Sequence, residues 1–504
     1  MTIRLSSACL IEQKIELIRI EVELRVGQVG FQMLGIRGQL VSQLKQRLFS
    51  ALRCCGVKLP STILINLECS KVIKNSSAID LAIAIGMLVA CAKTRINRQD
   101  FLVLGKVDIN GDVHAFAGLY ALVYQAKKLG YKNFIIPQES LESLVLIPDL
   151  KYCAVKNLKE CLGDKIYFQQ CFFKSGVRSL DSAKKDSGQL LNLPSQKLLW
   201  RIFKIAAAGG HHLLLFGGVG VGKSLLARQF QSLMPPPNML ELAEIQEISS
   251  ICEVEYQNSD WSQQTRPFRA PHHRISSAAL FGSSRSFGEV TLAHRGVLFL
   301  DELLEFSRSQ LEGLRIPLDQ RKLLISRQGE QYALPANFQL IAATNLCQCG
   351  AYSSNSACCT CSKAQIQSYK RKLSQSMLDR IDLQIELKSA NICDLHEATI
   401  CDMSELVLDS EIKKVQEVRF SSFERAGCSN SELAESVLRI NCCTPSAERF
   451  LEELSRKKAY SVRRFFKLLR VARTIADLDG SSFVEIPQVA EAASYAGLTF
   501  SGDY

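Results

Sequence analysis

Hydrophobic and polar positions in the first third of the chain follow two different periods. From residue 17 to residue 29 apolar side chains recur at nearly every second position, which predicts a half-buried strand. The same criteria predict strands over 62–67, 101–105 and 133–137, helices over 40–52, 79–92 and 119–129, and a hairpin turn at Asn110-Gly111. Residues 1–168 are therefore expected to form an α+β domain.

The pattern changes twice beyond this domain. Residues 169–195 contain Ser, Lys, Asp and Gly without periodicity, which predicts a linker. Strands and helices alternate from 196 to about 390, an order typical of a parallel α/β sheet. Residues 391–504 lack strand signals and predict a helical domain. The predicted fold class is therefore a multidomain α/β protein.

Composition narrows the class of protein. The chain has 504 residues, of which 22% are charged and 47% hydrophobic, and these values exclude a disordered chain, a collagen and a small disulfide scaffold. The longest apolar run, residues 81–92, is shorter than the ~20 residues that cross a bilayer. Because no N-terminal segment has the pattern of a secretion signal, we expect a cytoplasmic protein that does not enter a membrane.

One segment matches a nucleotide-binding motif in full. Residues 217–224 fit the phosphate-loop pattern G-x-x-x-x-G-K-[ST], between a predicted strand (213–216) and a predicted helix (225–233). In such a loop, backbone N–H groups surround phosphates, the lysine neutralises phosphate charge and the hydroxyl binds Mg²⁺. The sequence thus predicts a site for ATP and Mg²⁺ made by Gly217, Gly218, Val219, Gly220, Val221, Gly222, Lys223 and Ser224.

Two later strands end in polar residues that suit the same site. The apolar run 296–300 ends in Asp301 and Glu302, for which we predict the roles of Mg²⁺ ligand and of the base that polarises the attacking water. The run 338–344 ends in Asn345, which could orient that water against the γ-phosphate. A strand followed by a helix cap would give the same Asp-Glu pattern, but its position after a phosphate loop favours the catalytic interpretation.

Several longer segments resemble the magnesium-chelatase-like branch of the AAA+ ATPases, and most of all the ComM/YifB family. They include RPFRAPHH at 266–273, GEVTLAHRGVLFLDEL at 288–303, FQLIAATN at 338–345, LDRID at 378–382 and VARTIADLD at 471–479. The resemblance implies a hexameric ring-forming motor. It also implies a Lon-protease-like N-terminal domain (1–168), an AAA+ core with chelatase-type inserts (196–390) and a C-terminal helical lid (391–504).

The resemblance assigns two arginines to the ATP site that subunits of such a ring share. Arg380 stands where related motors have the arginine finger, which reaches into the ATP site of a neighbouring subunit. Arg463 matches the sensor arginine of the lid, although the adjacent Arg464 competes for that role. A surface ion pair is the alternative interpretation of both residues.

The cysteines form one cluster with metal-ligand spacing. Of 19 cysteines, five fall between residues 347 and 361, and the odd total argues against a disulfide framework. Cys347, Cys349, Cys359 and Cys361 form two Cys-x-Cys pairs, whose four thiolates would close a tetrahedral, structural Zn²⁺ site. Cys358 is an alternative to Cys359. A loop of reduced cysteines without metal is the alternative to the whole site.

The Lon-like domain lacks the residues of a peptidase. By the resemblance, Ala78 stands at the serine position of the proteolytic site and Leu122 stands near its lysine position. Ser77 and Lys127 are close in sequence, but a slip of one residue would direct their side chains elsewhere, and a hydroxyl without a base is a weak nucleophile. We expect a catalytically inactive domain that helps ring assembly or partner docking.

Positive charge bears on the choice of partner. The net charge is +11, and residues 1–168 hold 22 Lys and Arg against 14 Asp and Glu, which permits nucleic-acid binding without establishing it. Two inserts, 268–294 and a predicted hairpin over 324–332, would project into the channel of a ring. Arg285 and Arg327 are therefore candidate contacts to the phosphate backbone of DNA. His272 and His273 are expected to pack within the first insert rather than to bind a metal.

These features predict a Mg²⁺-dependent ATPase that translocates on single-stranded or branched DNA. The resemblance implies ATP-driven branch migration in recombination or DNA uptake. The alternative is a chelatase-type motor that remodels a protein partner without DNA, which the sequence does not distinguish from the first. An ATP-dependent peptidase is disfavoured by Ala78 and Leu122.

Overall fold

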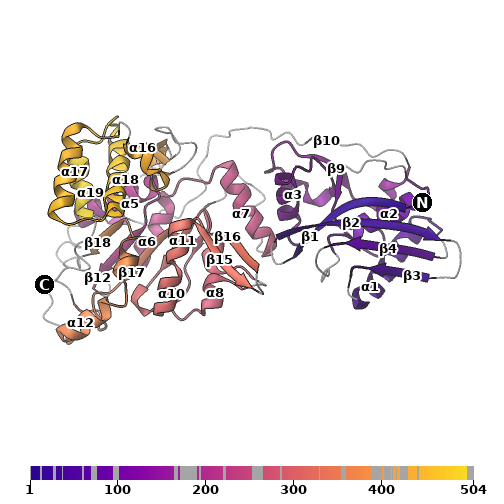
Figure 1. Cartoon of the computed structure of the whole chain (residues 1–504), viewed down its shortest axis with the longest axis horizontal. Helices are drawn as coiled ribbons and strands as arrows, with labels where there is room; N and C mark the ends of the chain where they lie inside the picture. The colour runs from indigo at the N-terminus through magenta and orange to yellow at the C-terminus, as the bar shows by residue number, and fades with distance from the viewer. Residues whose placement is uncertain are drawn as a thin grey trace. The chain divides into compact units, whose positions relative to one another are not determined.

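The structure is a computed structural model of the chain (Figure 1). It describes residues 2–495 except 12–13, 26–29, 37, 59–61, 70–76, 95–100, 164–168, 171–189, 192–193, 219–222, 253–264, 284–285, 328–329, 353–358, 388–399, 402–409, 411–412, 416, 420–428 and 440–441. The chain divides into two units. The first comprises residues 1–179, 238–262 and 284–286, and the second comprises 180–237, 263–283 and 287–504.

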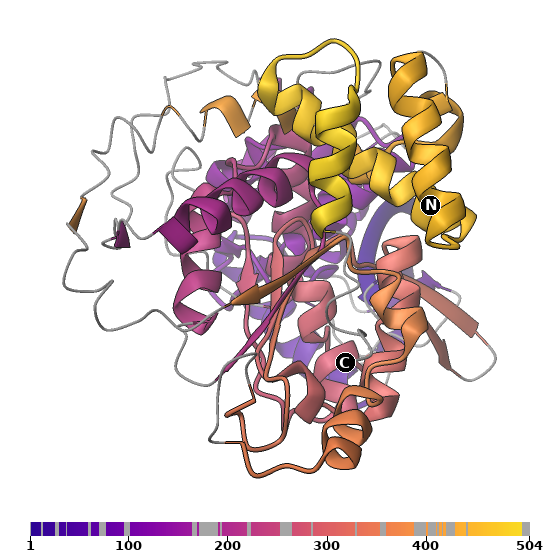
Figure 2. The same cartoon turned by 90° about the vertical axis from the view of Figure 1, so that its left-hand side faces the viewer.

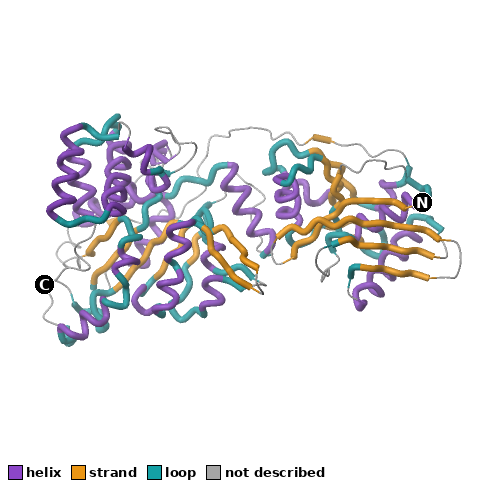
Figure 3. Tube along the Cα trace, viewed as in Figure 1, coloured by secondary structure: helices purple, strands orange, loops and turns teal. Residues whose placement is uncertain are grey.

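One sheet forms the framework of the first unit, drawn in orange in Figure 3. Among the described residues its order is β10-β9-β8-β5-β1-β2-β4-β3. β1 and β2 form an antiparallel ladder from Thr2 opposite Glu23 to Ile11 opposite Lys14, and β5, β8 and β9 continue from β1 in parallel. The strands are β1 Thr2–Ile11, β2 Lys14–Arg25, β3 Gly30–Leu34, β4 Thr62–Glu68, β5 Phe101–Val103, β8 Asn133–Pro137, β9 Lys151–Val155 and β10 Gln169–Gln170.

An apolar helix lies at the centre of this unit's core. Helix α2 is buried from Asp80 to Leu88 and packs on β1 and β2, because it is apolar on nearly every face. Helix α3 contacts the same two strands and α1 contacts α2. The helices and the small hairpin are α1 Gly38–Cys54, α2 Asp80–Ala90, α3 Leu119–Lys128, η1 Gln138–Ser140, α4 Leu141–Leu144, η2 Leu158–Cys161, β6 Lys106–Val107 and β7 Val113–His114.

Helix α7 (Met239–Ile251) belongs to the first unit although it follows the phosphate-loop helix in sequence. It lies against α3, where Gln125 donates a hydrogen bond of 2.7 Å to Glu247 and the Gly118 N–H donates one of 2.7 Å to the Ser250 carbonyl. The sequence analysis expected this stretch within residues 196–390. The helix pattern alone does not reveal the surface that the helix covers.

The second unit is built on a parallel sheet. Its order among the described residues is β13-β14-β17-β12-β18, with β12 between β17 and β18. All neighbouring pairs run parallel, so the carboxyl ends of the strands meet at one edge. The strands are β12 Leu213–Gly217, β13 Phe268–Arg269, β14 Val297–Leu300, β17 Gln339–Thr344 and β18 Leu383–Leu387.

Helices cover both faces of this sheet. Leu213 and Leu215 of β12 pack in one apolar cluster with α5 (Pro194–Gly209), α6 (Lys223–Leu233) and α18 (Val462–Asp479). Leu214 and Phe216, which point to the opposite face, pack in a second cluster. That cluster includes residues of α8 Ser277–Phe281, α9 Glu289–Leu292, η4 Leu303–Glu305, α10 Arg308–Gly313, α12 Lys363–Lys370 and α13 Gln375–Leu378.

The C-terminal helices form a group beside the sheet. Helices α17 (Pro445–Lys457), α18 and α19 (Ile486–Tyr495) pack on one another, as the yellow and orange helices in Figure 2 show, and α18 also packs on α5. The remaining elements are α11 Arg315–Gln320, the hairpin β15 Lys322–Arg327 with β16 Glu330–Pro335, the pair β11 Leu190–Leu191 with β19 Ile400–Cys401, η5 Asn430–Glu432 and α16 Glu435–Arg439.

Most predicted elements are confirmed to within a few residues. The predicted hairpin turn at Asn110-Gly111 joins β6 and β7, and the predicted insert hairpin is β15 with β16. The structure adds β1, β3 and β9, which the sequence analysis did not predict, and places the short strand β19 in the segment expected to be helical. In the described part of the chain no helix is both long and apolar enough to cross a membrane.

Candidate active site

The phosphate-loop segment joins β12 to α6 at the carboxyl edge of the parallel sheet. Gly217 ends β12, and a Cβ atom there would lie 2.4 Å from the Leu387 carbonyl oxygen, so only glycine fits beside β18. Helix α6 begins at Lys223. Val219, Gly220, Val221 and Gly222 lie outside the described residues, as does the side chain of Ser224, which is in the first turn of α6.

Lys223 connects the loop to the neighbouring strand. Its Nζ donates hydrogen bonds to the carbonyls of Gly217 (3.1 Å) and Gly218 (2.9 Å) and to Oδ1 of Asn345 (2.7 Å). Burial lowers the pKa of Lys223, whereas Asp301 and Glu302 act in the opposite direction. The predicted phosphate-binding lysine, sensor asparagine and carboxylate pair therefore lie around one point.

Asp301 and Glu302 follow β14 at the same edge. The Glu302 N–H donates to Oδ1 of Asp301 at 2.9 Å, and Glu302 has the left-handed backbone conformation (φ +51°, ψ +48°) that non-glycine residues rarely adopt. The Glu302 side chain is 50% exposed, and its Oε2 lies 2.9 Å from Nδ1 of His273. The rings of His272 and His273 are 4.1 Å apart, so these histidines do contact each other, but the sequence did not predict the contact with Glu302.

The two predicted arginines lie together on Asp319 of α11. Nε of Arg380 donates to Oδ2 of Asp319 at 3.0 Å, and Arg463 donates to Oδ1 of the same carboxylate. Arg464, the competing sensor residue, instead lies over the ring of Tyr460 at 4.6 Å. Asp319 belongs to no recognisable motif, which is why the sequence analysis did not name it.

Lys467 of helix α18 holds the backbone on either side of Arg380. Its Nζ donates to the Asp379 carbonyl at 2.9 Å and to the Ile381 carbonyl, and it lies 3.8 Å from Oδ1 of Asp382. Burial lowers the pKa of Lys467 to about 8. The sequence analysis did not single out this lysine, because one basic residue in an amphipathic helix resembles a surface residue.

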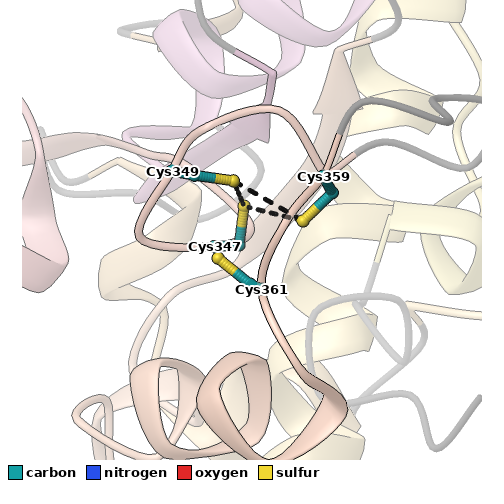
Figure 4. Close-up of side chains that lie close together, drawn as sticks. All are labelled: Cys347, Cys349, Cys359 and Cys361. Atoms are coloured by element: carbon teal, nitrogen blue, oxygen red, sulfur yellow. Dashed lines mark hydrogen bonds between the residues drawn. The ribbon is translucent and has the colours of Figure 1, made fainter.

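The four predicted zinc ligands form a single cluster (Figure 4). All four Sγ atoms of Cys347, Cys349, Cys359 and Cys361 lie within 4.8 Å of one another, and the closest pairs are separated by 3.2, 3.5 and 3.7 Å. A disulfide needs about 2.05 Å, so the thiols are free. Cys358, the alternative ligand, lies outside the described residues.

This geometry fits a tetrahedral metal. Zn–S bonds of about 2.3 Å place thiolates about 3.8 Å apart, close to the observed separations. Two backbone N–H groups face the sulfurs: Tyr352 donates to Cys347 at 3.3 Å, and the N–H of Ala351 lowers the pKa of Cys349 to about 6. The cluster also lies near the phosphate loop, because a Cβ atom on Gly218 would be 3.7 Å from the Gly350 carbonyl oxygen.

The remaining predicted residues are less informative. Arg327 is the last residue of β15 at the tip of the insert hairpin, and its side chain is outside the described part of the structure, as is Arg285. In the first unit, Ala78 and Leu122 are buried in the apolar core. Burial lowers the pKa of Lys127 on α3. A buried alanine and leucine at the two Lon positions provide neither nucleophile nor base.

The strand order and the phosphate-loop motif together define the second unit as a P-loop nucleotide-binding core. Profiles of magnesium chelatase, subunit ChlI, match three stretches of the chain: residues 20–140, residues 190–395, and residues 410–496 for the C-terminal part. The chain belongs to the magnesium-chelatase-like AAA+ proteins of the ComM/YifB family. Membership of this family implies ATPase activity.

Two relatives match the chain over nearly its full length. Competence protein ComM of Haemophilus influenzae is 32% identical over 498 residues, which are 96% of this chain and 95% of that protein. The uncharacterized protein YifB of Escherichia coli is 32% identical over 493 residues, 95% of this chain and 94% of that protein. An archaeal Lon protease of Methanocaldococcus jannaschii is 32% identical over 63 residues, 12% of this chain and 10% of that protein.

Proposed function

We propose that the protein is a ring-forming, Mg²⁺-dependent ATPase that moves along single-stranded or branched DNA and drives branch migration in recombination or DNA uptake. The observation that carries the proposal is the convergence of Lys223, Asn345 and the Asp301-Glu302 pair at the carboxyl ends of neighbouring parallel strands. The name of the Haemophilus influenzae relative, a competence protein, supports a role connected with DNA uptake.

Hydrolysis assigns one task to each of these groups. Lys223 neutralises the β- and γ-phosphates, and Ser224 with Asp301 holds Mg²⁺, which supplies further charge neutralisation when bound. Glu302 accepts a proton from water as the water oxygen bonds to the γ-phosphorus, and the bond from that phosphorus to the bridging oxygen of ADP breaks. Asn345, held beside Lys223, orients the water.

Completion of the site requires a second subunit. Arg380 and Arg463 lie on one carboxylate, that of Asp319, so they occupy one surface of the second unit. In a ring of subunits, proposed here to be hexameric, this surface faces the neighbour's ATP, and Arg380 stabilises the charge that develops on the γ-phosphoryl group. Arg463 is proposed as the lid sensor in preference to Arg464, since Arg464 lies over Tyr460.

DNA would be held in the channel of the ring by backbone contacts. The tip of the β15–β16 hairpin carries Arg327, and the first insert carries Arg285; both are proposed to contact phosphates without reading bases. The first unit (1–168 in the expected domain scheme) is proposed to assist assembly or docking, since Ala78 and Leu122 offer no peptidase chemistry.

The cysteine cluster is proposed to hold one structural Zn²⁺ through Cys347, Cys349, Cys359 and Cys361. Four thiolates leave no open position, so the metal has no catalytic task. Because Cys347 follows Asn345 by two residues and Gly350 lies near Gly218, the metal would fix both the sensor residue and the start of the phosphate loop.

The proposal is tested by the ATPase rate of the purified protein with and without forked DNA at low salt. We expect forked DNA to raise kcat several-fold and single-stranded DNA to raise it less, with the stimulation falling as salt rises because phosphate contacts release counterions. If no nucleic acid stimulates turnover at any salt concentration, the DNA assignment is wrong and the motor acts on a protein partner.

A further inference from the structure

A histidine of the first insert contacts the residue to which we assign the catalytic proton transfer. Nδ1 of His273 lies 2.9 Å from Oε2 of Glu302, and the imidazole is 21% exposed. An N–H at Nδ1 donates to this oxygen, which lowers the electron density available for accepting a proton from water. The contact also directs the carboxylate toward the insert.

The loop that carries His273 is anchored on both sides. Before it, Arg269 of β13 makes a two-pronged ion pair with Glu289 of α9, at 2.6 and 2.7 Å. After it, Gln310 of α10 donates to the Ile275 carbonyl at 2.7 Å. The position of His273 is therefore set by the packing of β13, α9 and α10 rather than by a flexible surface side chain.

The same loop also faces solvent. His272 and Arg274, on either side of His273, are exposed, as are Ser276, Ser277, Ala278 and Ala279 at the start of α8. A polyanion on this surface would meet Arg274 directly beside His273. Movement of the loop by such a ligand changes the separation between His273 and Glu302, because the bond spans two segments that are 29 residues apart.

We propose that His273 is a positioning residue that restrains Glu302 until the first insert binds its polyanionic ligand, so that hydrolysis is coupled to the substrate in the channel. The inference rests on the proposed role of Glu302 as the base. In the restrained state Glu302 is held on the insert. When the loop moves, the bond breaks and the carboxylate turns to the water beside the γ-phosphate.

The test measures kcat and KM for ATP in the absence of any nucleic acid. Loss of one hydrogen bond corresponds to about a fivefold shift between restrained and released populations, so His273→Ala should raise basal kcat by about this factor and leave KM unchanged. His273→Asn, which keeps a side-chain N–H donor, should stay near the wild-type rate. His272→Ala is the matched control, because His272 is the adjacent exposed histidine, and it should have no effect.

Two outcomes overturn the inference: a basal kcat for His273→Ala that equals or falls below that of wild type, or a rise in His272→Ala of equal size. Binding of a fluorescent ATP analogue to every variant shows whether the fold is retained, and His273→Asn serves if the alanine variant is unstable. A separate failure, normal turnover by Glu302→Gln, would refute the proposed role of Glu302 itself.

Discussion

Arg380 and Arg463 are bound to the two oxygens of one carboxylate, that of Asp319 on helix α11. The two arginines are 83 residues apart in sequence and come from different elements, the turn after α13 and the first turn of α18. Opposite charges on Asp319 hold both guanidinium groups side by side and lower the pKa of that carboxyl, against the effect of burial. A finger and a sensor that share one anchor are positioned together, so the lid helix and the finger respond to nucleotide as one body.

A finger in trans predicts complementation between two inactive variants. Lys223→Ala subunits lack a working phosphate loop but supply Arg380, and Arg380→Ala subunits have the converse defect. Random mixing at equal amounts restores about one quarter of the shared sites, since each active site needs one subunit of each kind in the right order. The measurement is ATPase activity of co-assembled rings. Demonstrated mixed rings without any activity would contradict a finger in trans.

Lys467 predicts a loss of turnover without a loss of stability. Lys467→Met removes the bonds to the Asp379 and Ile381 carbonyls on either side of Arg380, so kcat should fall about tenfold, as when a catalytic group is misplaced by an ångström or less. Stability should change little, because the lysine is a buried charge whose desolvation offsets its bonds.

The matched control is Lys457→Met, a lysine-to-methionine change at an exposed position of α17. Steady-state kinetics and a thermal melt are measured for both variants. A Lys467→Met protein with wild-type kcat would show that these bonds do not position the finger.

The zinc proposal predicts about one Zn²⁺ per chain in the purified protein, measured by elemental analysis. Changing Cys347 and Cys349 together to serine should remove the metal, because a hydroxyl is a poor ligand for Zn²⁺ in place of a thiolate. ATPase activity should fall while ATP binding survives, since Lys223 lies on a separate strand–helix turn. Cys54→Ser, a change at an exposed cysteine outside the cluster, is the control and should keep the metal. Metal-free, fully active wild-type protein would contradict the site.

Much of this arrangement could be predicted from local sequence, and the rest depends on long-range contacts. Strand ends reveal Asp301, Glu302 and Asn345, because a buried parallel strand is an uninterrupted apolar run and its first polar residues stand out. The partners of these residues are not visible in this way. His273 and Asp319 reach the site only through tertiary packing, and no periodicity encodes a contact between segments so far apart in the chain.

The fold shows the same division. The long antiparallel partner of β2, strand β1, was missed because its C-terminal half is buried on successive residues and so lacks a clear alternation. Helix α7 was expected in the ATPase core, yet its hydrogen bonds from Gln125 and Gly118 bind it to α3. Local patterns determine which element forms, whereas the choice of surface depends on side chains elsewhere.

The nucleotide site predicts different defects for two of its residues. Lys223→Ala should abolish ATP binding, because the ammonium group contacts ground-state phosphates. Glu302→Gln should keep binding and lose turnover by a factor of about 100 or more, because the amide cannot accept the proton from water. Binding of a fluorescent ATP analogue and steady-state turnover separate the two effects. Turnover at the wild-type rate by Glu302→Gln would be incompatible with its role.

The central claim, that ATP hydrolysis at this site drives movement on branched DNA, is tested most directly by branch migration of a synthetic four-way junction. Wild-type protein with ATP and Mg²⁺ should convert the junction to forked products, whereas Glu302→Gln should bind ATP and the junction without converting it. Conversion of the junction by Glu302→Gln at the wild-type rate, or its absence with wild-type protein that hydrolyses ATP, would contradict the account.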